Sequence, residues 1–238
     1  MVRKIIALAL SVAAMGCATP QPWSFNLADF LMAKELPYDS PPQVIYRIDD
    51  HRFVTLEKYR DCNHGETWYN DTEAGIRSHL GRGLVENYQG RLINADPTGR
   101  NLVFPAATAP GTVCGDRGCN PMMAYSTDGG RTFNGMVYKD HSPDPYKGSM
   151  KFTVITTSDS VYVSETLDPD FNTVDTARYP MIPGFVYERR ETLPEGKRID
   201  FNASAPSGLR TPSGQDHITC DASIKPTNPD APLVRGRQ

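Results

Sequence analysis

The chain has 238 residues, of which 25 are basic and 28 acidic, so its formal charge is −3 at neutral pH. Without residues 1–16, which include Arg3 and Lys4 and no acid, 23 basic residues face 28 acidic ones, a charge of −5. This mild acidity argues against binding to nucleic acid or to anionic lipid headgroups, and the length is enough for one domain with a real core.

The N-terminus resembles a bacterial lipoprotein signal peptide. Two basic residues precede an apolar run from Ile5 to Ala14, and Gly16 lies directly before Cys17. The run is too short to span a bilayer as a stable helix, so residues 1–16 are expected to be cleaved and Cys17 to be acylated. Ala18, rather than an aspartate, follows Cys17, and in such signals this favours the outer membrane. The alternative is an ordinary secretory signal with a chance cysteine.

Residues 17–37 are expected to form an acylated tether and one short helix. The helix is predicted over residues 25–36 from the spacing of its apolar side chains, with Ser24 or Asn26 as N-cap. Pro37 ends it, because proline lacks the amide proton that a continuing helix needs.

From residue 38 onward the apolar residues alternate with polar ones, as in β-strands. Three pairs of such runs are separated by turns and are predicted as hairpins: 44–48 with 52–56, 90–94 with 101–104, and 152–156 with 161–164. Short strands punctuated by Gly, Pro, Asn and Asp predict an all-β domain over residues 38–202, mainly of antiparallel hairpins, as a sandwich, a barrel or a propeller-like fold.

A tail rich in Pro, Gly, Ser and Asn follows over residues 203–238. We expect residues 203–216 and 225–238 to be poorly ordered, with only the segment around Cys220 held to the domain.

Four cysteines besides Cys17 indicate two disulfides in an oxidising compartment. Three pairings are possible, and we favour Cys114–Cys119, around a short turn, with Cys62–Cys220. A metal site formed by Cys62, His64, Cys114 and Cys119 is the alternative.

Residues 126–133, Ser-Thr-Asp-Gly-Gly-Arg-Thr-Phe, resemble the Asp-box found on hairpins of sialidase-type propellers. An aspartate in the turn can accept backbone N–H bonds, and a glycine can adopt positive φ. Residues 61–68 form a degenerate copy. The matching positions are Ser126, Asp128, Gly130, Thr132 and Phe133 in the first copy and Gly65, Thr67 and Trp68 in the second. We expect a structural role for both copies, because Asp-boxes lie away from the catalytic face.

No catalytic residues are predicted. Arg47, Arg178, Arg189 and Arg190 do not have the spacing of a sialidase arginine triad, and Asp49 replaces the proline expected after Tyr46-Arg47-Ile48. The sequence contains no nucleophile elbow, no Walker or Rossmann glycine pattern and no histidine pair at metal-ligand spacing. We therefore expect no enzyme activity, no metal and no cofactor.

The signal peptide, the 44–56 hairpin, the Gly65–Asp71 segment and residues 123–133 together resemble the immunity lipoproteins of type VI secretion lipase (phospholipase) effectors. The shared domain would cover roughly residues 38–190. The resemblance implies a periplasm-facing lipoprotein, held in the membrane by its acyl chains, that binds and neutralises a cognate secreted lipase.

The resemblance assigns no contact residues, so we look to loops, which supply recognition on rigid β scaffolds. The predicted partner-binding residues are Asp49, Asp50, His51, Tyr69 and Asp71, followed by Asp116 and Arg117. The alternatives are a sialidase-like lipoprotein that binds or cleaves glycans, and a structural lipoprotein of the envelope.

Overall fold

The computed structural model describes residues 25–236 except 169, 171–172 and 188–191, so the signal peptide and Cys17 lie outside the described residues. The helices of the described part are α1 (Leu27–Met32), η1 (Val85–Asn87, a 3-10 turn) and α2 (Pro145–Ser149). The strands are β1 (Gln43–Arg47), β2 (Arg52–Asp61), β3 (His64–Asp71), β4 (Ile76–Arg82), β5 (Arg91–Asn94), β6 (Leu102–Pro105), β7 (Met122–Ser126), β8 (Asn134–Val137), β9 (Phe152–Thr156), β10 (Ser160–Asp168) and β11 (Thr173–Pro180). Among these residues, no helix is long and apolar enough to cross a membrane.

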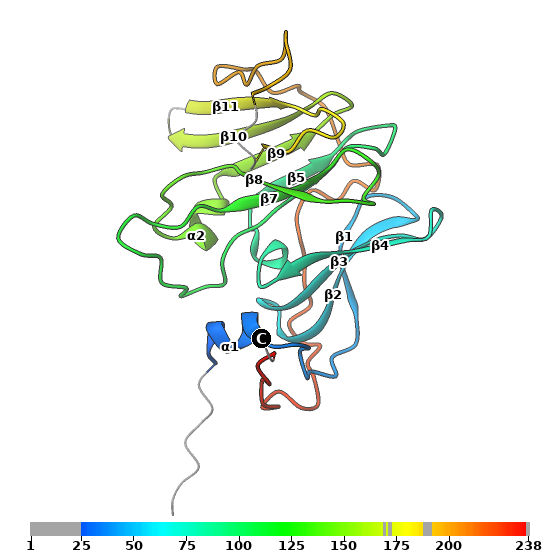
Figure 1. Ribbon diagram of the computed structural model, residues 1–238, viewed down its shortest axis with the longest axis vertical. Coiled ribbons are helices and arrows are strands. Elements are labelled where there is room, and N and C mark those ends of the chain that lie inside the picture. Colours follow the sequence, from blue (N-terminus) through cyan, green and yellow to red (C-terminus); the bar gives the residue numbers. More distant parts are fainter. Residues whose placement is uncertain (1–24, 169, 171–172, 188–191, 237–238) are drawn as a thin grey trace, which may run out of the picture.

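The strands form three sheets, in the orders β1-β2-β3-β4, β11-β10-β9-β5 and β6-β7-β8. All neighbouring strands are antiparallel except β5 and β9, which are parallel. In Figure 1 the β1–β4 sheet occupies the lower half of the molecule and β9–β11 the top, with β5, β7 and β8 between them. The prediction of a mainly antiparallel, all-β fold is confirmed, and the described residues form a sandwich-like arrangement without a closed barrel.

Two of the three predicted hairpins are confirmed. β1 pairs with β2, and β9 pairs with β10, each through a short turn. The third is wrong: β5 and β6 are strands, but β5 pairs with β9 and β6 with β7. The side chain of Asn94 bonds both backbone groups of Val103, donating to its carbonyl (3.0 Å) and accepting from its N–H (2.9 Å). The Asn94 side chain bonds the backbone of β6 as a neighbouring strand would. The strands β5 and β6 can therefore lie side by side and still belong to different sheets.

Helix α1 is shorter than predicted. Asn26 caps it as expected, since its Oδ1 accepts from the backbone N–H of Ala28 at 2.9 Å. The helix ends at Met32 because Ala33 adopts extended backbone and forms a β-bridge with Arg235 near the other end of the chain. Helix α2 and the 3-10 turn were not predicted; α2 begins after the capping side chain of Asp144, with Pro145 at its first position.

The main core lies between the sheets and is rich in tyrosine. Its largest fully buried side chains include Tyr46, Tyr59, Tyr69, Tyr88 and Tyr125. The hydroxyl of a buried tyrosine usually has a hydrogen-bond partner, and that of Tyr46 donates to the carbonyl of Leu92 in β5 at 3.0 Å. Tyr46 lies in β1, so this bond connects two sheets through the core.

The tail over residues 203–236, which we call the C-terminal strap, runs between the edges of two sheets. The N–H of Thr219 donates to the carbonyl of Ile45 in edge strand β1 at 2.8 Å. The N–H of Leu92, in edge strand β5, donates to the carbonyl of Asp216 at 2.8 Å. The strap therefore occupies backbone groups on both edges and joins the two sheets.

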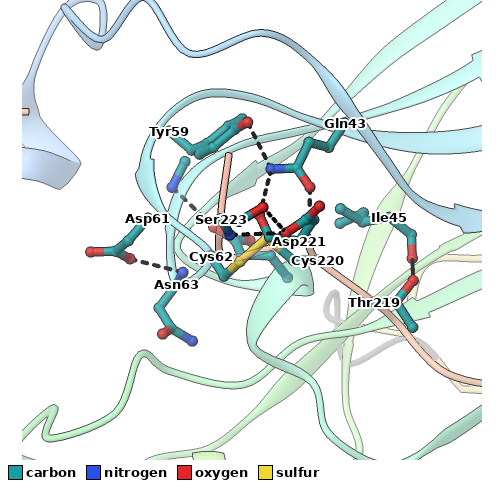
Figure 2. Close-up of a disulfide and its surroundings, with 12 residues drawn as sticks. Gln43, Ile45, Tyr59, Asp61, Cys62, Asn63, Thr219, Cys220, Asp221 and Ser223 are labelled. Carbon is teal, nitrogen blue, oxygen red and sulfur yellow. Dashed lines mark hydrogen bonds between the residues drawn. A yellow bond between two sulfur atoms is a disulfide. The ribbon is translucent and has the colours of Figure 1, made fainter. Parts of the chain in front are cut away.

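Side-chain amides of the strap and of β1 extend this pairing. The Oε1 of Gln215 accepts from the N–H of Arg47 at 2.8 Å. The amide of Gln43 donates to the carbonyl of Asp221 (3.2 Å) and accepts from its N–H (2.9 Å), as Figure 2 shows. The strap satisfies β1 along its length without becoming a regular strand.

A disulfide between Cys62 and Cys220 fastens the strap to the β2–β3 turn (Figure 2), and a second joins Cys114 to Cys119. This is the pairing favoured from the sequence, and it uses the thiols that the alternative metal site required. Beyond Cys220, the amide of Asn228 donates to the carbonyl of Pro37 at 2.8 Å. The expectation that only the segment around Cys220 is held to the domain is wrong for the described residues, because composition does not reveal bonds to distant strands.

Candidate functional site

Four turns, one after each of β1, β3, β5 and β7, surround a groove of about 540 Å³ that we call the turn groove. All three sheets contribute to it. Its lining comes from residues 51–52, from positions between 71 and 76, from 97–100 and from positions between 127 and 131. Most of these residues are polar or charged, so the turn groove suits polar recognition rather than an apolar ligand.

The β1–β2 turn is held by Asp49. Its carboxylate accepts from the backbone N–H groups of His51 (3.2 Å) and Arg52 (2.8 Å) and from Nε of Arg52 (2.7 Å). Burial opposes ionisation of Asp49, but the hydrogen bonds from Arg52 outweigh it and hold the pKa of this carboxyl below its usual value. Asp49 is therefore ionised and fully engaged within its own turn.

His51 connects this turn to the β3–β4 turn. Its Nδ1 lies 2.9 Å from Oδ1 of Asp71, and its Nε2 lies 3.3 Å from Oε2 of Glu73. The hydrogen bond to Asp71, with smaller contributions from Asp49 and Glu73, raises the pKa of His51. Asp71 also accepts from the backbone N–H of Ala74 at 2.9 Å. The histidine thus bridges carboxylates from two turns and favours its charged form.

The β7–β8 turn contains the Asp-box-like residues. Oδ1 of Asp128 accepts from the hydroxyl of Ser126 (2.7 Å) and the N–H of Thr132 (3.0 Å), and its Oδ2 accepts from the hydroxyl of Thr132 (2.7 Å). The N–H of Gly130 donates to Oγ of Ser126 at 2.9 Å. Burial raises the pKa of Asp128, but these hydrogen bonds dominate and lower it. The turn is a self-contained hydrogen-bonded unit.

The earlier copy, at the β2–β3 turn, does not repeat these contacts. The side chain of Asn63, in the position of Asp128, donates to Oδ1 of Asn87 at 2.8 Å. The hydroxyl of Thr67 is directed to the carbonyl of Gly81 (3.3 Å). Gly65 and Thr67 are buried, and Trp68 is half-buried under the guanidinium of Arg77. That these two segments are Asp-boxes stays a prediction.

Contacts between the turns hold the walls of the groove together. The N–H of Gly129 donates to the carbonyl of Arg100 (2.9 Å), and the hydroxyl of Ser78 in β4 donates to the carbonyl of Gly130 (2.6 Å). A Cβ at Gly99 would overlap the guanidinium of Arg52, so glycine lets that side chain lie across the β5–β6 turn. These contacts join turns from three sheets into one surface.

The structure brings together some of the predicted partner-binding residues and separates others. His51 and Asp71 line the turn groove, and Asp49 and the exposed Asp50 lie in the same β1–β2 turn as His51. Asp71 was predicted as an exposed loop residue, but it is the last residue of β3 and is buried, because its carboxylate bonds to His51 and to the N–H of Ala74. Tyr69 is not an exposed loop residue as predicted: it belongs to β3 and is fully buried, because it faces the core side of that strand.

Asp116 and Arg117 are exposed, but they lie elsewhere. With the adjacent disulfide and His141, they line a separate groove of about 480 Å³. Nδ1 of His141 lies 2.8 Å from the carbonyl of Arg117, which fixes this loop. The structure therefore offers two distinct loop surfaces.

Sequence reasoning missed the three arginines of the turn groove, Arg52, Arg100 and Arg131. A signal existed, since Arg100 and Arg131 each directly follow a turn glycine in a Gly-Arg pair. Of the arginines considered for a sialidase site, Arg47 and Arg178 belong to strands of different sheets, β1 and β11. Arg189 and Arg190 lie outside the described residues.

Comparison with known proteins gives one family. No curated protein sequence matches the chain. The family model described as "T6SS Tli3 immunity protein" matches residues 38–165, which is more than half of the chain. The match begins before β1 and ends within β10, so it includes all four turns of the turn groove. The chain belongs to the Tli3 family of type VI secretion system immunity proteins.

Proposed function

We propose that this chain is a membrane-anchored immunity lipoprotein that binds a cognate lipase or phospholipase effector in the periplasm and neutralises it. The observation that carries the proposal is the family match over residues 38–165, since an immunity protein acts by binding its cognate effector. A binding role fits a surface made of turns whose charged groups are fixed by hydrogen bonds.

The N-terminal sequence supports the location. Residues 1–16 have the features of a lipoprotein signal peptide, with acylation at Cys17. Acyl chains at Cys17 would hold the domain beside the phospholipids that a lipase attacks and so raise its local concentration there. Residues 17–37 would serve as tether and helix, and the domain from residue 38 onward would bind the effector.

The contacts proposed from the sequence divide between two surfaces. Asp49, Asp50, His51 and Asp71 belong to the turn groove and its rim, whereas Asp116 and Arg117 belong to the groove beside His141. Tyr69 supports the first surface from beneath, because its ring lies against Gly130.

The proposal is tested by coexpression with a candidate secreted lipase, sought among the genes beside this chain's gene. The lipase is directed to the periplasm and growth is followed. The chain should restore growth and co-purify with the lipase, and it should suppress hydrolysis of a phospholipid by the purified lipase. A catalytically inactive lipase serves as the binding control. Lack of both rescue and co-purification would rule out the lipase assignment.

Anchoring needs a separate measurement. Cells fed radiolabelled palmitate should label the wild-type chain and not the Cys17→Ser variant. The variant should still bind the lipase in solution but protect cells less well. Palmitate label that persists in Cys17→Ser would show that the lipid is attached elsewhere.

A further inference from the structure

The carboxylates of the turn groove are already engaged within the protein. Asp128 is bonded to Ser126 and Thr132, and Asp71 to His51 and to backbone N–H groups of its own turn. Such carboxylates have little capacity left for an incoming cation, since their lone pairs accept hydrogen bonds from fixed donors.

Two arginines of the same groove are free to bind. Arg100 and Arg131 are exposed, and neither guanidinium pairs with a carboxylate in the part of the chain that the structure describes. Arg131 donates from Nη1 only to the carbonyl of Asp128 in its own turn, at 2.8 Å. Arginine presents five donors in a planar fork that matches a carboxylate in bidentate geometry. The charge available to a ligand of the groove is therefore positive.

These two arginines come from turns that are already bonded to each other. The N–H of Gly129 donates to the backbone carbonyl of Arg100, so the backbones that carry the two guanidinium groups are held at a fixed separation. Because the two backbones are fixed relative to each other, binding an anion between the guanidinium groups has to order the two side chains alone. The pair is thus a built feature of the groove.

The rim argues for a protein segment rather than a membrane surface as the anionic partner. Glu73 is 78% exposed in its side chain, and Asp50 is exposed in the next turn. A broad anionic surface would meet both carboxylates at once, and like charges repel. A narrow acidic segment can reach Arg100 and Arg131 and pass by the rim.

We propose that the turn groove binds an acidic segment of the effector protein, whose Asp or Glu carboxylates pair with Arg100 and Arg131. This inference rests on the proposed function for the identity of the effector, but the chemistry of the groove can be tested without it. Arg52 takes no direct part, because its guanidinium is committed to Asp49.

The first experiment uses a fluorescein-labelled hexaglutamate peptide and the full-length chain in detergent at low salt, with binding followed by fluorescence anisotropy. We expect saturable binding that weakens with added salt and that is at least about tenfold weaker for Arg100→Glu/Arg131→Glu. The variant Arg100→Gln/Arg131→Gln should lose an intermediate amount of affinity for the peptide. Arg210→Glu, an exposed arginine of the strap, is the matched charge control and should bind like the wild type.

The second experiment measures the affinity of the same variants for the neighbouring lipase. The double reversal should again weaken binding at least about tenfold, whereas Arg210→Glu, outside both grooves, should not. If the lipase does not bind the wild type, the proposed function fails, and the peptide experiment still decides the groove's chemistry.

Three results would overturn the inference. One is hexaglutamate binding that is absent, or equal in the wild type and the double reversal. Another is an affinity for the lipase that the double reversal leaves equal to that of the wild type. The third is tight binding to phosphatidylglycerol vesicles through Arg100 and Arg131 without binding to hexaglutamate, which would assign the groove to the membrane surface.

Discussion

Gly130 is the residue on which the geometry of the β7–β8 turn depends. Its φ is +86°, and a Cβ there would overlap Cε1 of Tyr69 and lie 2.6 Å from Cδ1 of that ring. Gly130→Ala must therefore strain the backbone and push a buried aromatic ring aside. We expect a loss of about 2–4 kcal/mol in the free energy of unfolding, measured by urea denaturation.

Gly111→Ala is the control for this substitution. Gly111 also has positive φ (+76°), but a Cβ there would have no neighbour within 4 Å. Gly111→Ala should therefore lose only the contribution of backbone strain, about 1 kcal/mol in the free energy of unfolding. Equal losses in the two variants would mean that Tyr69 does not confine the turn.

Glu86 is a buried carboxyl that makes stability depend on pH. It accepts backbone N–H bonds from Gly83 (2.8 Å), Leu84 (2.9 Å) and Gly65 (3.3 Å). Desolvation by burial is the largest effect on it, and despite these bonds it raises the pKa of Glu86 from 4.5 to about 7. The folded state therefore holds this proton more tightly than the unfolded chain does.

The sign of the effect follows from proton linkage. Between pH 4.5 and about 7 the folded state binds more protons at Glu86 than the unfolded state, so this contribution to stability falls as pH rises. We expect the wild type to lose on the order of 3 kcal/mol relative to Glu86→Gln across that window. Urea unfolding of both proteins at several pH values measures the difference. A constant difference between the two curves would contradict the raised pKa.

At the scale of single residues, the sequence predicted contacts within one turn better than contacts between residues far apart in the chain. The residues around Asp128 lie within one turn, so their mutual contacts follow from the local motif. His51 and Asp71 are twenty positions apart, and only the β2–β3 register, in which Arg52 faces Asp71, brings them together. The burial of Tyr69 follows from the alternation of β3, which a loop interpretation of that segment ignored.

At the scale of elements, local sequence signals were sufficient to predict hairpins, but they did not predict which strands pair when these lie far apart in the chain. Hairpins such as β1–β2 are determined by a turn and two alternating runs, so they were predicted. The pairing of β5 with β9 joins residues about sixty positions apart and depends on the rest of the core, so no local pattern encodes it. Helix α2 has only five residues, too few to show helical periodicity in the sequence.

The Cys62–Cys220 disulfide, which fastens the strap, should contribute much more to stability than the Cys114–Cys119 disulfide. Cys62 and Cys220 are separated by 158 residues, and Cys114 and Cys119 by 5. In the chain-entropy model the long loop contributes about 5 kcal/mol and the short one about 2 kcal/mol. We expect Cys62→Ser/Cys220→Ser to lower the free energy of unfolding by the larger amount, as measured by urea denaturation.

Cys114→Ser/Cys119→Ser is the matched control. Each double variant leaves the other disulfide intact, so the two losses can be compared directly. If removing the short disulfide were as harmful as removing the long one, the constraint on the unfolded chain would not be the source of the stability.

At the scale of the whole molecule, the strap makes the C-terminal region part of the folded unit. The family match ends at residue 165 and the domain expected from the sequence ends at residue 202, yet the edges of β1 and β5 are bonded to residues beyond both limits. Composition alone marked this tail as loosely held. The backbone groups it satisfies belong to strands more than a hundred positions earlier, which explains why the sequence did not reveal its role.

Truncation tests whether the strap is needed for folding. A Cys62→Ser chain that ends after residue 202 is compared with full-length Cys62→Ser/Cys220→Ser, so that neither contains the long disulfide. The truncated chain should lose cooperative urea unfolding and its near-ultraviolet circular dichroism, because backbone groups on two sheet edges lose their partners and the buried hydroxyl of Tyr46 loses its bond to Thr211. A wild-type chain ending after residue 224 keeps Cys220 and the bonds to both edges, and it should unfold cooperatively with only a small loss. If the chain ending at residue 202 unfolded as cooperatively as the full-length double variant, the sheets would be complete without the strap, and the limit at residue 202 would stand.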